Sequence, residues 1–259
     1  MDISILLYIF VYAFGLCIGS FLNCAVYRLE HKKSLGGRSF CPHCKHTLNW
    51  KDLFPIFSFL LLKGKCRYCK KKISWQYPLV EAFTGLIFLF TYIFQFSGFN
   101  LFGLVSFGLL LSVYSLLIMI FVYDLKHYII PDRLLFPAII LSLLYLILNQ
   151  QLLILSYLLS SLIASGFFFC IFFFSRGQWM GFGDVKLAIL MGILLGWPNT
   201  FAALFLAFFL GAVIGIALMI LQKKGLKSEI PFGPFLITGT FISIFWGEKI
   251  VGWYLNFFA

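Results

Sequence analysis

Eight long apolar stretches, separated by polar segments, constrain this chain more than any other feature. They cover roughly residues 3–27, 78–96, 100–122, 133–148, 151–174, 185–197, 200–221 and 234–257. Most approach the roughly 20 residues that a helix needs to cross a bilayer, and the stretch at 185–197 is the shortest. The chain is 62% hydrophobic and 11% charged, whereas charged residues make up about a quarter of a soluble domain. The sequence therefore predicts an all-α polytopic membrane protein with about eight transmembrane helices.

The basic residues predict how these helices are oriented. The net charge is +11, and twelve of the twenty Lys and Arg residues lie between Arg28 and Lys72. The positive-inside rule places this segment in the cytoplasm, so we expect the N-terminus, and with eight spans the C-terminus, on the external side. Because the charge is concentrated beside membrane spans, it indicates a lipid bilayer as the partner and no nucleic acid.

The first apolar stretch lacks the basic start and the small-residue cleavage site of a removable signal peptide. We therefore expect residues 1–27 to form the first transmembrane helix, residues 28–77 a cytoplasmic loop, and residues 78–259 a core of seven membrane helices.

The predicted cytoplasmic loop carries two Cys-x-x-Cys motifs. Cys41 and Cys44 form the first, and Cys66 and Cys69 form the second, with twenty-one residues between the two motifs. This spacing is typical of a four-thiolate zinc site, in which each motif supplies two ligands from one tight turn. Disulfides are the alternative, but a reducing cytoplasm disfavours them. A short loop also gains order from a bound metal.

Two aspartates at the ends of apolar stretches are the candidate catalytic residues. Asp124 lies where the third span returns to the cytoplasm, and Asp184 lies where the sixth leaves it. An ionisable residue at membrane depth indicates a functional site, and a carboxylate pair can activate water and polarise a carbonyl. Asp184 has an alternative role as a helix N-cap. Gly181 and Gly183 favour catalysis, because glycines permit a close backbone approach by an extended substrate.

Three further polar residues are expected to support these sites. Asp132 follows a proline at the start of the fourth span, where a first-turn carboxylate stabilises the helix, and it is the nearest additional acid to Asp124. Lys186 either extends to the membrane surface or acts on the Asp184 carboxylate. Glu81 is an acid with apolar neighbours in the second span, which indicates function, with a helix–helix hydrogen bond as the alternative.

Several ordered motifs resemble the bacterial type IV prepilin peptidases, which are intramembrane aspartic proteases of the Gly-x-Gly-Asp type. The motifs are Gly19-Ser20-Phe21-Leu22-Asn23 with Arg28, the two cysteine motifs, Gly64-Lys65-Cys66-Arg67, Tyr77-Pro78-Leu79-Val80-Glu81, Asp124 with Ile130-Pro131-Asp132, residues 181–187, and Pro231-Phe232-Gly233-Pro234-Phe235. The resemblance covers nearly the whole chain.

The resemblance implies an enzyme of the bacterial inner membrane with two activities. It would cleave the leader of type IV prepilins or pseudopilins at the cytoplasmic face and then methylate the new N-terminus with S-adenosyl-L-methionine. It assigns Asp124 and Asp184 to the peptidase and the four cysteines to zinc, and it associates the loop with methyl transfer. A presenilin-like protease and a proton-coupled transporter or assembly scaffold are the alternatives. The cofactor-binding residues, the oligomeric state and the pilin, competence or secretion system served are not predicted.

Overall fold

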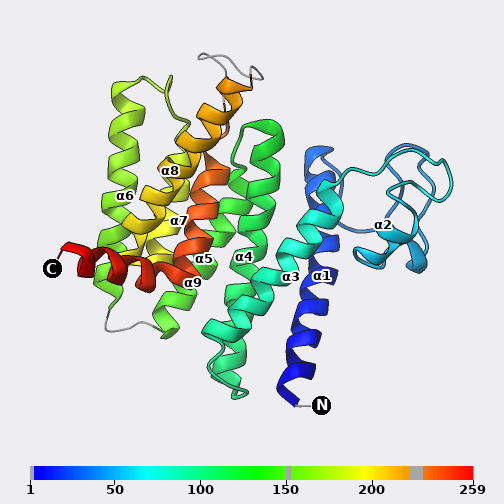
Figure 1. The fold of residues 1–259 in the computed structure, drawn as a ribbon, viewed down its shortest axis with the longest axis horizontal. Helices are drawn as coiled ribbons and strands as arrows, with labels where there is room; N and C mark the ends of the chain where they lie inside the picture. Colours follow the sequence, from blue (N-terminus) through cyan, green and yellow to red (C-terminus); the bar gives the residue numbers. More distant parts are fainter. Residues whose placement is uncertain (1–2, 150–152, 222–229, 259) are drawn as a thin grey trace. The chain divides into compact units, whose positions relative to one another are not determined.

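The computed structural model describes residues 3–149, 153–221 and 230–258, and these residues form helices without a β-strand (Figure 1). Eight helices correspond to the eight apolar stretches, which confirms the predicted all-α membrane fold. They are α1 (Ile3–Glu30), α3 (Gln76–Gln95), α4 (Leu101–His127), α5 (Asp132–Asn149), α6 (Ile154–Phe174), α7 (Phe182–Leu195), α8 (Asn199–Ile220) and α9 (Gly233–Phe258). The loop between α1 and α3 adds the short helices η1 (Trp50–Asp52) and α2 (Phe57–Leu61).

Seven of the eight helices are long and apolar enough to cross a membrane, and α7 is the exception. It has 14 residues, which gives about 21 Å at about 1.5 Å per residue, against a hydrocarbon core of about 30 Å. The apolar sequence of α7 is explained by contact with protein, because α7 packs against α5, α6, α8 and α9. A helix that is surrounded by other helices is apolar on all faces.

The chain forms two compact units, residues 1–103 and residues 104–259. In the first unit, α1 packs along α3. A Cβ atom on Gly15 would lie 2.7 Å from Cα of Gly85, and one on Gly19 would lie 2.7 Å from Cα of Glu81. The two backbones therefore approach as closely as glycine permits, as in the small-residue interfaces of membrane helices.

The second unit contains α5 to α9 and nearly all of α4. Its most buried side chains include Leu187, Leu190 and Met191 on α7, and Tyr114 on α4. The predicted cytoplasmic loop around residues 222–229 lies outside the described residues. The predicted functional division at residues 27 and 77 stays a prediction, since the compact units divide the chain at residues 103 and 104.

Candidate active site and candidate metal site

Asp124 is a buried acid in the last turn of α4. Its exposed fraction is 4%, and the end of α4 is an unfavourable place for a negative charge because helix C-termini carry partial negative charge. The carboxylate accepts a hydrogen bond from the backbone N–H of Gly233, the first residue of α9. The partial positive charge at the N-terminus of α9 therefore offsets the end of α4.

Asp184 is the third residue of α7 and is also buried, with an exposed fraction of 8%. The N-cap of α7 is Gly181, so the alternative that Asp184 caps the helix is wrong in position. Asp184 instead accepts a hydrogen bond from the Gly181 N–H, as the acid of a capping box does. The carboxyl groups of Asp184 and Asp124 also lie close enough to repel each other electrostatically. The structure thus brings together two aspartates that are sixty residues apart.

The glycines near the two aspartates differ in how closely they are packed. A Cβ atom on Gly233 would lie 2.4 Å from Oδ2 of Asp124, and one on Gly183 would lie 3.0 Å from Cβ of Ile130. On Gly181, a Cβ atom would keep an ordinary distance of 3.7 Å from Oδ2 of Asp184. Gly233 and Gly183 are therefore needed for packing around the aspartates, and a role of Gly181 and Gly183 in substrate docking stays a prediction.

Asp132 and Lys186 form an ion pair beside this site. Asp132 is the first residue of α5, as predicted, and its Oδ1 lies 2.5 Å from Nζ of Lys186 on α7. The lysine side chain is 20% exposed and the aspartate side chain 53% exposed. The pair joins the starts of α5 and α7, and the cation–π contact of Lys186 with Phe182 keeps the lysine close to the Gly-x-Gly-Asp segment.

The four cysteines of the loop form one cluster in the first unit. The Sγ atoms of Cys41, Cys44, Cys66 and Cys69 all lie within 4.8 Å of one another, and those of Cys41 and Cys69 are 3.9 Å apart. A tetrahedral zinc ion with Zn–S bonds of about 2.3 Å requires sulfurs about 3.8 Å apart. The cluster therefore fits a zinc ion in both donor chemistry and size. The His46 ring lies tilted against the Tyr68 ring, with ring centroids 3.7 Å apart.

The two cysteine motifs are copies of one structural unit. Residues 41–50 (CPHCKHTLNW) and 66–75 (CRYCKKKISW) share the cysteines, a lysine, a polar residue and a tryptophan at matching positions. The Cys41 N–H donates to the carbonyl of His46, and the Cys66 N–H donates to that of Lys71, both at 2.9 Å. Isolated β-bridges flank the two motifs at Phe40 and Thr47, and at Lys65 and Lys72. Each copy thus presents two thiolates from one turn.

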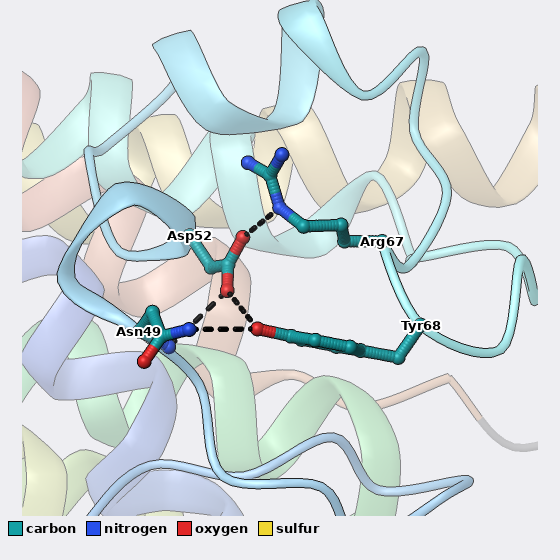
Figure 2. Close-up of polar contacts among 4 residues, drawn as sticks. All are labelled: Asn49, Asp52, Arg67 and Tyr68. Carbon is teal, nitrogen blue, oxygen red and sulfur yellow. Dashed lines mark hydrogen bonds and ion pairs between the residues drawn. The ribbon is translucent and has the colours of Figure 1, made fainter.

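A polar cluster joins the second motif to the segment that follows the first (Figure 2). Asp52 accepts hydrogen bonds from Arg67 at 2.7 Å, from the backbone N–H of Asn49 at 3.1 Å and from Tyr68 at 3.2 Å. Burial by itself raises the pKa of Asp52, but the hydrogen bonds from Arg67, Asn49 and Tyr68 outweigh it, so the pKa lies below its usual value. The carboxylate therefore holds both cysteine motifs in one arrangement.

Further buried polar residues occupy the α1–α3 pair. Glu81 on α3 accepts the backbone N–H of Ile56 at 2.7 Å and the hydroxyl of Ser20 on α1, so the expected helix–helix hydrogen bond is present beside a contact with the loop. Asn23 donates to the carbonyl of Tyr77 at 3.1 Å and accepts from Gln76 at 3.3 Å. Arg28 is 4% exposed. Its guanidinium donates to the carbonyls of Ser34, Leu35, Gly36, Gly37 and Arg38.

The sequence places Gly233 and Ile130 in motifs without indicating that they pack around the two aspartates, and it does not single out Asp52. Gly233 is 109 residues from Asp124, so only the glycine between Pro231 and Pro234 could have indicated a special backbone position. The signal for the duplicated cysteine motif was present in the sequence, as a repeat with a period of twenty-five residues.

Fold and site together define a polytopic membrane protein with a buried aspartate pair in one unit and a four-cysteine loop in the other. Two family models match the chain: Bacterial Peptidase A24 N-terminal domain over residues 13–95, and Type IV leader peptidase family over residues 111–216. The first match lies within the first compact unit and the second within the other.

Curated relatives cover nearly the whole chain. A protein of Bacillus subtilis (strain 168) is 33% identical over 95% of this chain and 97% of its own length, and one of Legionella pneumophila is 31% identical over 97% and 95%. Both are named prepilin leader peptidase/N-methyltransferase. No solved structure gives a significant match. The chain belongs to the type IV leader peptidase family, a family of proteases. This membership disfavours the presenilin-like and transporter interpretations.

Proposed function

We propose that this protein removes the leader of type IV prepilins or pseudopilins and then methylates the new N-terminal amine. The observation that carries the proposal is the buried pair of Asp124 and Asp184 in the unit that the leader-peptidase model matches. The relatives' name, with its two activities, supports it. The match of two family models to two compact units agrees with two activities in one chain.

In this proposal Asp124 and Asp184 share one proton and act as a dyad. The ionised carboxylate accepts a proton from a water molecule, which attacks the scissile carbonyl carbon, while the protonated carboxyl donates its proton to the carbonyl oxygen. The carbon–nitrogen bond then breaks as the proton taken from water passes to the leaving amine, and the second carboxyl regains its proton from a hydroxyl of the tetrahedral intermediate. The Gly233 N–H fixes the Asp124 carboxylate, and the Gly181 N–H fixes that of Asp184, so both are held before the substrate arrives.

Orientation follows from charge and helix order. Asp124 near the end of α4, Asp132 at the start of α5 and Asp184 at the start of α7 lie at one end of the second unit, with the basic Lys126 and Lys186 beside them. By the positive-inside rule this end faces the cytoplasm, as the loop of residues 28–77 does. The dyad would then meet a prepilin where its basic leader joins its apolar helix.

This orientation makes accessibility predictions. A cysteine introduced by Gln178→Cys, in the exposed segment after α6, should react with a membrane-impermeant maleimide only after the membrane is opened. Ser97→Cys, in the exposed segment between α3 and α4, should react in intact spheroplasts. The reverse pattern would contradict the orientation, and the parent chain gives the background from its native cysteines.

For methyl transfer, the proposal places the site in the first unit and zinc in the four-cysteine cluster. S-adenosyl-L-methionine, when bound, supplies the methyl group to the substrate amine, which loses a proton. The four thiolates would hold zinc as a structural ion, because four protein ligands leave no open position for chemistry. Asp52 and Arg67 would keep the two halves of the loop together. Glu81 would hold the loop against α3.

The experiment that tests the proposal uses the full chain in liposomes with a membrane-inserted prepilin and S-adenosyl-L-methionine. Intact mass should shift from the precursor to the mature chain, and then to a product heavier by one methyl group. A precursor of unchanged mass would refute the peptidase assignment. A mature chain without the methyl group would refute the transferase assignment alone.

A further inference from the structure

The loop between α1 and α3 exposes a continuous run of large apolar side chains. We call the exposed large apolar residues of α2 and of the segment between η1 and α2 the α2 surface. Its members are Leu53, Phe54, Phe57, Leu60 and Leu61. Leu61 is 82% exposed and Phe57 is 62% exposed. Five such residues within nine positions exceed the scattered single apolar residues of an ordinary protein surface, so the α2 surface indicates an interaction site.

The depth of α2 along the helices identifies what lies next to it. The N-cap of α2, Ile56, donates its backbone N–H to Glu81 at 2.7 Å, and Glu81 packs against Gly19 of α1. Gly19 lies about 24 Å from the start of α1 at about 1.5 Å per residue. The hydrocarbon core is about 30 Å thick, so this level is at the inner edge of the bilayer and not beyond it. Figure 1 shows α2 beside the α1–α3 pair.

The attachment of α2 at this level is specific. Ile56 has φ of 60° and ψ of −51°, a conformation that β-branched residues rarely adopt. Such strain persists only where surrounding contacts impose it. The buried Glu81 carboxylate provides that contact and fixes the start of α2 beside α3.

The charge around the α2 surface is complementary to an anionic bilayer. Lysines flank the α2 surface on both sides, at Lys51 before it and at Lys63 and Lys65 after it, and all three are exposed. Basic residues beside an exposed apolar face are typical of segments that lie in the interface of an anionic membrane. The loop is joined at both ends to membrane helices, α1 and α3. These helices already hold it at the bilayer, so its contact with lipid costs little additional translational entropy.

We propose that the α2 surface inserts into the boundary between headgroups and acyl chains of an anionic bilayer. Phe57, Leu60 and Leu61 enter the acyl region, and Lys51 and Lys63 contact lipid phosphates. The insertion holds the four-cysteine loop against the membrane surface. This role is independent of the proposed peptidase and transferase activities.

The test uses a fluorescent amino acid introduced in place of Leu61 in the otherwise unchanged chain. The control replaces Leu35, which lies in the same loop, outside the α2 surface, and is 60% exposed. Each variant is reconstituted in vesicles of phosphatidylglycerol and phosphatidylethanolamine, with or without acyl-brominated lipid. We expect brominated lipid to quench the probe at position 61 at least about twofold more than at position 35, and aqueous iodide to show the opposite order.

Two results would overturn the proposal. Equal iodide quenching at the two positions, without quenching by brominated lipid, would show that the α2 surface faces water. Protection from iodide at position 61, again without quenching by brominated lipid, would show that a protein, such as a second copy of this chain, covers it. The substituted side chains are exposed, so the variants keep the packing of the loop.

Discussion

Substitution of Gly233 by alanine tests how closely the start of α9 fits the candidate dyad. The added Cβ atom would lie 2.4 Å from Oδ2 of Asp124 and 3.3 Å from Cδ1 of Ile130. Since real Cβ atoms essentially never approach within 3.0 Å, either the carboxylate or α9 must move. Rotating Asp124 away from its rotamer costs about 0.5–1.5 kcal/mol, and losing a hydrogen bond to a charged group costs about 1.5–3 kcal/mol.

The expected effect on catalysis is larger than the effect on stability. A displacement of about 1 Å in a catalytic group reduces the rate by about 100-fold, so we expect Gly233→Ala to slow leader cleavage by about that factor. The assay is cleavage of a membrane-inserted prepilin, with thermal unfolding in detergent measured in parallel.

Gly166→Ala is the matched control, because Gly166 is in α6 of the same unit and a Cβ atom there would have no neighbour within 4 Å. It should cleave at the parent rate and gain up to about 1 kcal/mol of helix stability. A Gly233→Ala variant that is folded and cleaves as fast as Gly166→Ala would refute the tight fit around Asp124.

Three further outcomes are expected. Asp124→Asn should reduce cleavage to background, because the members of a dyad act as a unit; a rate near half that of the parent in the prepilin assay would contradict this. Cys66→Ser should release zinc, as measured by metal analysis, and reduce methylation more than cleavage; normal methylation without zinc would place the transferase site in the helices. Asp52→Ala should speed zinc transfer to a chelator several-fold, because Arg67 and Tyr68 lose their common acceptor, while Lys51→Ala should not; equal rates would contradict a role of Asp52 in holding the loop.

The helices could be predicted well because the length of an apolar stretch is determined by consecutive residues of the sequence. Each of the eight apolar stretches became a helix, and Asp132 begins α5 after its proline. The sequence did not show that α7 lies inside the second unit, because an apolar run has the same composition whether lipid or protein surrounds it. The pairing of α3 with α1 depends on contacts at Gly15, Gly19 and Gly85. Gly15 and Gly19 form a Gly-x-x-x-Gly motif, which is typical of close membrane-helix pairs, but the motif does not show which helix is the partner.

For the candidate sites too, features set by nearby residues could be predicted and contacts between distant residues could not. The four-cysteine cluster could be predicted from spacing because each pair of ligands lies within one turn, and the structure brings the two pairs together. The surroundings of Asp124 could not, because Gly233 contacts it across more than one hundred residues. Glu81 was singled out for its apolar neighbours, and its partners are the hydroxyl of Ser20 on α1 and the backbone N–H of Ile56. A backbone donor in a strained turn leaves no mark in the sequence.

We propose that cleavage and methylation use different units of one chain, and the Asp184→Asn variant separates the two activities. The purified variant in liposomes is given two substrates with S-adenosyl-L-methionine: an intact prepilin and the same chain already cleaved. We expect the intact precursor to keep its mass and the cleaved chain to gain one methyl group at the parent rate. Loss of methylation on the cleaved chain, or cleavage of the precursor, would contradict it.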